Sequence, residues 1–213
     1  MHRGTQIGKH ALGTCGRVRM ITAAREAVDL LQQASNSWHF DGTRHGMRDR
    51  EWMALRFLAR ANRFSRTPSA LAKFVGTTRA TVSEMVKQLE VKGYLERKAS
   101  DKDKRSVVLC ITPRGEKILT RDPIAPLVTA MTTVELGAHN FRDALRHVLD
   151  RLGTAEHAAH ADNCRQCIFL TETGSKARSK VQAEYTCRIF RTAVTREEMD
   201  LLCFNSERRE AAG

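Results

Sequence analysis

The chain has 213 residues and a formal net charge of +12, from 36 Lys and Arg against 24 Asp and Glu. Its length suits one domain with an appended segment, and its 41% of hydrophobic residues argues against a disordered chain. The longest stretch without charge, residues 123–134, is well below the roughly 20 residues of a spanning helix, and the basic N-terminus lacks the apolar segment of a secretory signal. We therefore expect a cytoplasmic protein in a reducing compartment, without a membrane partner.

The surplus of positive charge has two readings. It strengthens binding to nucleic acid, because each phosphate that a protein neutralises releases condensed counterions. A basic surface that only keeps the protein in solution is the other reading, and composition alone leaves both open.

Turn formers and helical patterns divide the first part of the chain. Residues 1–18 hold basic residues and no acidic ones, and they are predicted to form a flexible basic arm. From Arg19 apolar residues recur at helical spacing. Residues 35–47 contain turn formers and predict a connection, and a second helix is predicted over residues 49–60.

Two short helices with a tight turn between them follow. Thr67 and Pro68 predict a helix start, with a hydroxyl at the N-cap and proline at the first helical position. Gly76 ends this helix because glycine readily adopts the positive φ of a tight turn. The next helix is predicted from residue 77 or 78 to residue 92, and its apolar residues are spaced i, i+3, i+4, i+7 along one face.

Two β-prone segments, residues 94–98 and 106–111, flank a polar tip and predict a small hairpin. Helical character returns from about residue 116 with an interruption near Asp122. A capping box at residues 132–135 then predicts the start of a long helix that ends near Leu152. The predicted fold is mostly α with a small β-wing (α+β): a winged helix-turn-helix domain over residues 19–152, followed by a linker and cysteine-rich tail over residues 153–213.

This arrangement predicts contact with double-stranded DNA. A helix fits the major groove and its N-terminal residues reach base edges, while a basic wing contacts phosphates or the minor groove. Arg79 suits guanine or phosphate, and the hydroxyl side chains suit phosphates or mixed base contacts. The candidate DNA-binding residues are Thr77, Thr78, Arg79, Thr81, Ser83 and Lys87 in the helix, and Arg97, Lys98, Lys102, Lys104 and Arg105 in the wing.

Several linked motifs resemble the DNA-binding core of MarR-family transcriptional regulators. They are Leu71-Ala72, the T-x-S-x-x-V-x-x-L pattern from Thr81 to Leu89, the K-G-Y-L turn at residues 92–95, the D-x-R of the wing at residues 103–105, and the L-x-I-T-x-x-G run that ends at Gly115. The resemblance covers roughly residues 20–152, and it is specific because the motifs occur as a linked set.

The resemblance implies a homodimer whose first and last helices interlock, and which binds a pseudo-palindromic operator, usually as a repressor. It places Arg105 at the wing tip, in the minor groove of narrow A·T-rich tracts. It also implies association with the bacterial nucleoid and a small aromatic acid as an effector. Ser100 and Lys104 depart from the family pattern, which often has Asp and Arg at these positions.

Four of the six cysteines lie in the tail: Cys164, Cys167, Cys187 and Cys203. Two thiols in a C-x2-C turn can grip one metal, and two distant thiols can complete its coordination. The spacing therefore predicts a four-cysteine metal centre, with an iron–sulfur cluster slightly favoured over zinc. A reversible thiol–disulfide switch, a purely structural zinc clip and four small buried side chains remain open.

The tail carries one further local pattern. Thr195-x-x-Glu198 predicts a capped short helix with Met199, Leu202 and Cys203 on one face. A disulfide oxidoreductase using the C-x2-C pair is the enzyme alternative, but no βαβ pattern surrounds the motif. No other catalytic motif is present, so we predict a regulator, not an enzyme, whose operator affinity responds to a redox or metal signal or to a small ligand.

Overall fold

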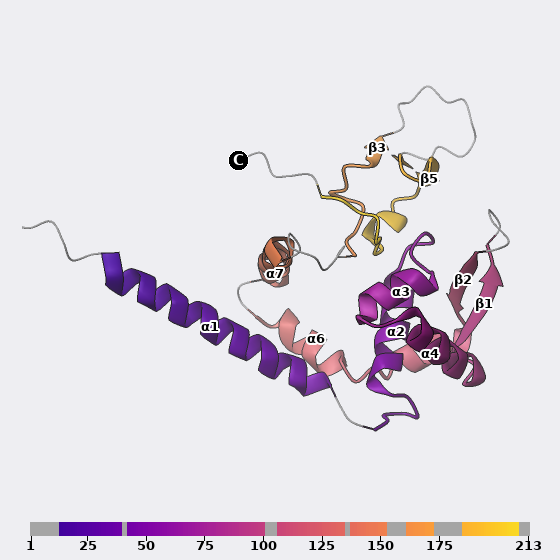
Figure 1. The fold of residues 1–213 in the computed structure, drawn as a ribbon, viewed down its shortest axis with the longest axis horizontal. Coiled ribbons are helices and arrows are strands. Elements are labelled where there is room, and N and C mark those ends of the chain that lie inside the picture. Colours follow the sequence, from indigo (N-terminus) through magenta and orange to yellow (C-terminus); the bar gives the residue numbers. More distant parts are fainter. Residues whose placement is uncertain are drawn as a thin grey trace, which may run out of the picture. The chain divides into compact units, whose positions relative to one another are not determined.

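The computed structural model describes residues 13–39, 42–100, 106–134, 137–152, 161–172 and 185–208 (Figure 1). The chain divides into two compact units, Met1–Asp41 and Gly42–Gly213. Among its described residues, the first unit has one long helix, α1 (Gly13–Trp38). This helix begins earlier than the predicted Arg19 and extends into the predicted connection.

The second unit holds the winged-helix elements and the tail. Its elements in chain order are α2 (Asp49–Arg60), α3 (Pro68–Val75), α4 (Arg79–Val91), β1 (Leu95–Ala99), β2 (Val107–Ile111), α5 (Pro113–Leu119), α6 (Ala125–Thr132), α7 (Ala138–Leu152), β3 (Leu170–Glu172), β4 (Tyr185–Cys187), β5 (Thr192–Val194) and a single 3₁₀ turn, η1 (Glu198–Asp200). The mostly helical fold with a small antiparallel wing is confirmed.

The core of the winged helix forms where α2, α3 and α4 pack together with the wing. Fully buried Trp52, Leu71 and Leu89 come from the three helices, and Leu109 comes from β2. Burying such side chains contributes about 1.5–3 kcal/mol each relative to exposure. Packing against α2, α3 and the wing therefore sets the orientation of α4. Its opposite face is exposed to solvent.

The helix α3 begins and ends where the residues at its two ends predicted. The Thr67 hydroxyl accepts a hydrogen bond from the backbone N–H of Ala70 at 3.2 Å, and Pro68 occupies the first helical position. Gly76 ends the helix with a φ of 66°, in the left-handed region where glycine has no Cβ penalty. The predicted turn between the two helices is confirmed.

The wing is an antiparallel pair in which Leu95 lies opposite Ile111 and Ala99 lies opposite Val107. Its base is held to the helices, because the backbone N–H of Leu109 donates to the carbonyl of Arg66 at 2.8 Å. The predicted wing strands are therefore confirmed, each shifted by one residue at its start.

The region after the wing has the predicted interruption near Asp122, but its last helix begins later than predicted. The interruption near Asp122 separates α5 from α6, and Asp122 is held there by a bidentate pair with Arg56 at 2.8 Å. The last helix begins at Ala138, not within the capping box at residues 132–135. Thr133 instead terminates α6, and Gly137, with a φ of 74°, precedes α7.

Candidate nucleic-acid interface and the cysteine cluster

The helix α4 buries one face and exposes the other, as its apolar spacing predicted. Val82, Met85, Val86 and Leu89 are buried. The predicted contact residues on the opposite face are exposed: Arg79, Thr81, Ser83 and Lys87. This exposed row, with two cations separated by two helical turns, is here called the α4 polar row.

The two threonines that precede α4 stabilise its N-terminus and the turn before it. The Thr78 hydroxyl accepts a hydrogen bond from the N–H of Thr81 at 3.2 Å and lies 3.0 Å from the Thr81 hydroxyl. Thr77 is half-buried, and its backbone N–H donates to the Ala72 carbonyl at 3.0 Å. Both residues therefore hold the turn that aims α4.

In the wing, two predicted cations lie on β1 and are exposed. Arg97 pairs with Glu90 at 2.6 Å, and Lys98 pairs with Glu96 at 2.6 Å. The hydrogen bond to Glu96 raises the pKa of Lys98, which keeps the ammonium charged. Exposed pairs of this kind contribute little to stability, so these cations can exchange a carboxylate for a phosphate. The predicted wing residues Lys102, Lys104 and Arg105 lie outside the described residues.

One buried carboxylate binds the C-terminal end of α4. Glu51 is buried in the first turn of α2, and its two oxygens accept from the Lys92 ammonium at 2.6 and 2.8 Å. It also accepts from the backbone N–H of Arg48 at 2.7 Å. The pair joins the end of α4 to the start of α2, and no local pattern in the sequence indicated it.

The four tail cysteines lie together in one buried cluster. Cys164, Cys167, Cys187 and Cys203 pack with Leu170, Val194 and Met199, and these seven residues are here called the cysteine cluster. The backbone groups of Cys203 and Asp162 exchange hydrogen bonds at 2.8 and 3.2 Å, and the N–H of Cys164 donates to the Met199 carbonyl at 2.9 Å. The four cysteines predicted as metal ligands therefore lie in one buried core.

The thiols in this cluster do not share the same electrostatic environment. The hydrogen bond from Cys164 lowers the pKa of Cys203 to about 6, against the opposing effect of burial, and hydrogen bonds from Asn62 and Ser65 act in the same direction. The same bond to Cys203, together with burial, raises the pKa of Cys164. Among the described residues, no group of three or more His, Cys, Asp or Glu side chains is arranged to hold a metal ion.

The predicted capping motif of the tail is confirmed. The N–H of Glu198 donates to the Thr195 hydroxyl at 3.3 Å, and the N–H of Thr195 donates to the Glu198 carboxylate at 3.1 Å. The predicted helical face of Met199, Leu202 and Cys203 is wrong, because the helix is a single 3₁₀ turn, η1, and Leu202 and Cys203 follow it in β-bridges. Met199 is buried in the cysteine cluster.

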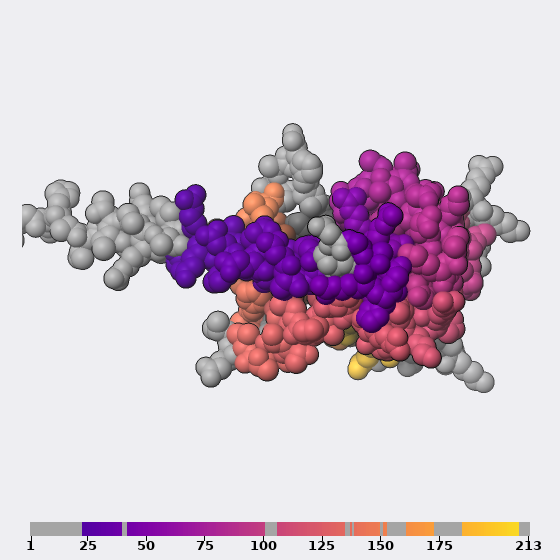
Figure 2. Space-filling view, turned by 90° about the horizontal axis from the view of Figure 1, so that it is seen from below, coloured from indigo at the N-terminus to yellow at the C-terminus, as the bar shows by residue number. Residues whose placement is uncertain are grey.

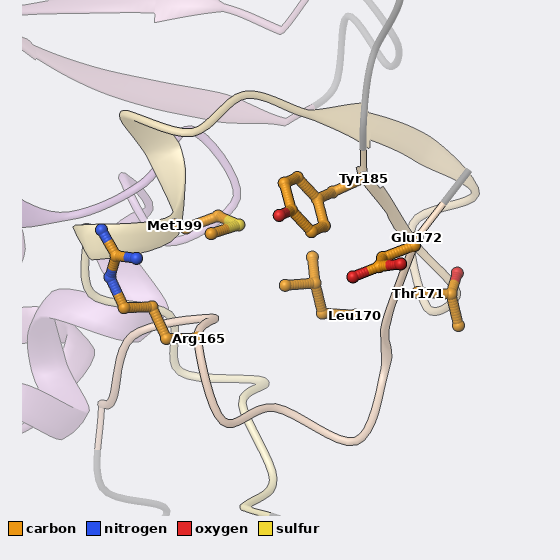
Figure 3. A pocket seen from close by; sticks show the side chains of 6 residues that line it. All are labelled: Arg165, Leu170, Thr171, Glu172, Tyr185 and Met199. Carbon is orange, nitrogen blue, oxygen red and sulfur yellow. The ribbon is translucent and has the colours of Figure 1, made fainter. Parts of the chain in front are cut away.

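A cavity of about 490 Å³ opens beside this cluster (Figure 3). Figure 3 shows the side chains of Leu170, Tyr185 and Met199 converging on it. Arg165, which forms an ion pair with Asp200, lies at its edge.

None of the described helices combines the length and the apolar character that a membrane-spanning helix requires.

The chain shares its winged-helix segment with known regulators. Residues 45–106 match the sequence profile of the MarR family. An uncharacterized HTH-type transcriptional regulator of Bacillus subtilis (strain 168), YdcH, is 36% identical over 85 residues, which cover 39% of this chain and 58% of YdcH. The transcriptional repressor MprA of Escherichia coli (strain K12) is 30% identical over 118 residues, which cover 52% of this chain and 65% of MprA.

The matches therefore span less than two thirds of either relative. The crystal structure of the MarR family transcription regulator SP03579 aligns with a TM-score of 0.50 and 23% identity, covering 67% of this chain and 98% of that chain, and it shares the fold. Members of the MarR family are transcriptional regulators, not enzymes. The winged-helix part of this chain, residues 45–106, is similar to that of MarR-family regulators.

Proposed function

We propose that this protein is a transcriptional regulator that binds a specific site in double-stranded DNA. The observation that carries the proposal is the exposed α4 polar row on a helix whose opposite face is buried. Such a helix enters the major groove, where the donors and acceptors of each base pair are distinct. The match to a transcriptional repressor supports repression as the direction of regulation.

In this proposal the residues of α4 and β1 have different tasks. Arg79 has the planar donor geometry that guanine O6 and N7 accept, so it reads sequence. Lys87, Arg97 and Lys98 neutralise phosphates and set the register of the protein on the duplex. Arg105 remains predicted to enter the minor groove from the wing tip.

We further propose a homodimer, because exposed apolar side chains occur on two of the helices. Val28 is 63% exposed on α1, an elongated rod of side chains in Figure 2. Phe141, Val148 and Leu152 are exposed at helical spacing on α7, and Leu152 is 67% exposed. Contiguous exposed apolar residues of this kind mark association surfaces. A two-fold dimer would present two α4 helices to half-sites about 34 Å apart on a pseudo-palindrome.

The effector of this regulator is proposed to be a small acidic molecule. A cavity of about 530 Å³ lies between α2 and α4, within the usual size range of small-molecule sites. Arg48, Arg50 and Thr81 line it together with Glu84 and the ion pair of Lys92 with Glu51, so the two arginines are the cations that can meet an acid. A carboxylate bound beside these cations would lie next to the DNA-reading face.

The variant Arg79→Ala tests the DNA-binding proposal. We expect its affinity for a site selected from random duplexes to fall by about tenfold to a hundredfold, because a bidentate contact to guanine contributes about 1–3 kcal/mol of discrimination. Affinity for random duplex should fall much less. Fluorescence anisotropy at several salt concentrations measures both.

Lys117→Ala is the matched control, since it removes one exposed positive charge from α5 rather than from α4. It should leave the preference for the selected site unchanged. If the wild-type protein binds the selected site no more tightly than random duplex, the proposed function is wrong.

Val148→Lys tests the proposed dimer. A charge placed on the exposed apolar row of α7 has to be desolvated in an apolar interface, which costs several kcal/mol. We expect the variant to be monomeric by light scattering at micromolar concentration and to bind the selected site more weakly. His147→Lys places the same charge on the neighbouring exposed position, off this row, and should remain dimeric. A monomeric wild-type protein at these concentrations would refute the dimer.

A further inference from the structure

We propose that Cys164, Cys167, Cys187 and Cys203 together bind one metal centre through their thiolates, and that this centre fastens the tail to the connection between α2 and α3. This inference concerns the tail and does not rest on the proposed DNA binding.

The tail is too small to be held by apolar packing alone. In its described part, β3, β4 and β5 contain three residues each, and η1 is a single turn. Besides the four thiols, the cysteine cluster contains Leu170, Val194 and Met199, and only the partly buried Phe169, Tyr185 and Phe190 pack against it. Units of this size usually need a disulfide or a metal to be stable. The four cysteines form no disulfide in this structure, and a single tetrahedral metal would cross-link all of them.

The four thiols reach one core from separate places in the chain. Cys164 and Cys167 lie in one tight turn, where the N–H of Cys167 donates to the Cys164 carbonyl at 3.1 Å. Cys203 lies close enough to Cys164 to raise the pKa of its thiol, and Cys187 lies opposite Leu170 across the β3–β4 pair. A C-x2-C turn with two further thiols is the donor set that zinc and iron–sulfur centres use.

Polar groups of the winged helix are directed at one of these sulfurs. Asn62 is 2% exposed, and its side-chain oxygen accepts from the N–H of Ser65 at 3.0 Å. Asn62, the fully buried Ser65 and the backbone of Asn205 all lie close enough to Cys203 to lower the pKa of its thiol. Hydrogen bonds to a ligand atom orient it and stabilise its negative charge. A purely apolar cluster of cysteines would have no need of these buried donors.

The same region joins the tail to the winged helix. The Phe64 and Phe190 rings stack with centroids 4.0 Å apart, and the backbone of Leu202 bonds to Arg60 at 2.7 Å and to Asn62 at 2.8 Å. The carbonyl of Arg66, at the end of this connection, holds the wing through Leu109. The tail therefore packs on the segment that leads into α3 and that holds the base of the wing. If the tail loses its ordered structure, this segment loses those contacts.

Geometry indicates how the centre would form. The cavity of Figure 3 shares Leu170 and Met199 with the cysteine cluster and therefore lies next to the thiols, although no cysteine lines it. No three of the described ligands are already arranged to hold an ion, so the sulfur atoms must draw together as it binds. Metal binding and ordering of the tail are then coupled.

Metal analysis of the full-length protein, purified without oxygen, tests the proposal. We expect either about one zinc per chain and no colour, or iron with acid-labile sulfide and absorbance near ~400 nm. The two results identify the metal, and each supports the site. Cys187→Ser should lower the bound metal roughly tenfold or more, whereas Cys110→Ser, which changes the half-buried cysteine of β2 outside the cluster, should retain it. Wild-type protein without zinc or iron, whether its cysteines are free or joined in disulfides, would overturn the proposal.

A second measurement applies if Cys187→Ser does not fold. The metal is removed from the wild-type protein with a chelator, and hydrogen exchange is followed by mass spectrometry. Amides of residues 61–66 should exchange faster after removal, and protection should return when the same metal is added back. Unchanged exchange in this segment would show that the centre does not fasten the tail to the α2–α3 connection.

Discussion

Replacing Trp52 with alanine is expected to lower the free energy of unfolding by about 3–5 kcal/mol. Trp52 in α2 is fully buried and is the largest such side chain among the described residues. Its removal deletes apolar contacts and leaves a cavity that the neighbouring helices fill only in part. Its indole N–H also donates to the carbonyl of Arg44 at 3.2 Å, and this bond is lost. Denaturant unfolding followed by circular dichroism measures the change.

Trp52→Phe separates the two contributions, because phenylalanine fills much of the same space without the indole N–H. We expect it to retain most of the stability and to lose roughly 1 kcal/mol for the missing hydrogen bond, plus the smaller volume. If the alanine variant unfolds with a loss below about 1 kcal/mol, which is typical of surface sites, the described packing of α2 is incorrect.

Gly115→Ala is expected to destabilise the base of the wing by about 3 kcal/mol, the upper end of the cost of overpacking. Gly115 is buried near the start of α5, and a Cβ there would overlap the carbonyl oxygen of Tyr94 and stand 2.7 Å from a methyl carbon of Ile111. A backbone carbonyl cannot turn aside as a flexible side chain can. α5 would therefore have to move away from the wing, which thermal unfolding detects.

Gly76→Ala is the matched control for this change. Gly76 has a φ of 66° but open space where a Cβ would stand, so the substitution meets only the strain of the left-handed backbone. That strain costs about 1–2 kcal/mol. If both variants lose the same amount of free energy of unfolding, the close contact at Gly115 does not hold α5 against the wing.

Local chemistry explains why the centre of the fold was predictable. The N-cap at Thr67, the proline after it and the glycine at residue 76 act within one turn of the chain, so their effect is visible in the sequence. The same holds for α4, whose spacing of apolar residues separated its buried face from the α4 polar row. The capping pair of Thr195 and Glu198 also acts over three residues and was predicted.

Interactions between distant residues were not predictable in this way. Glu51 and Lys92 are 41 positions apart, and Arg56 and Asp122 are 66 positions apart. In the sequence each of these four side chains is an ordinary charged residue with no local pattern to mark its partner. Only the packing of α2 against α4 and α5 brings the partners into contact and makes the charges part of the architecture.

The amino-acid sequence by itself determined the winged helix, the exposed face of α4 and the grouping of four cysteines in the tail, because caps, glycines and periodicity act locally. The tertiary structure alone decided where that tail packs. It placed Asn62 and Ser65 against Cys203, residues separated by more than half the chain, because the hydrogen-bonding needs of buried polar groups are met only when distant segments fold together.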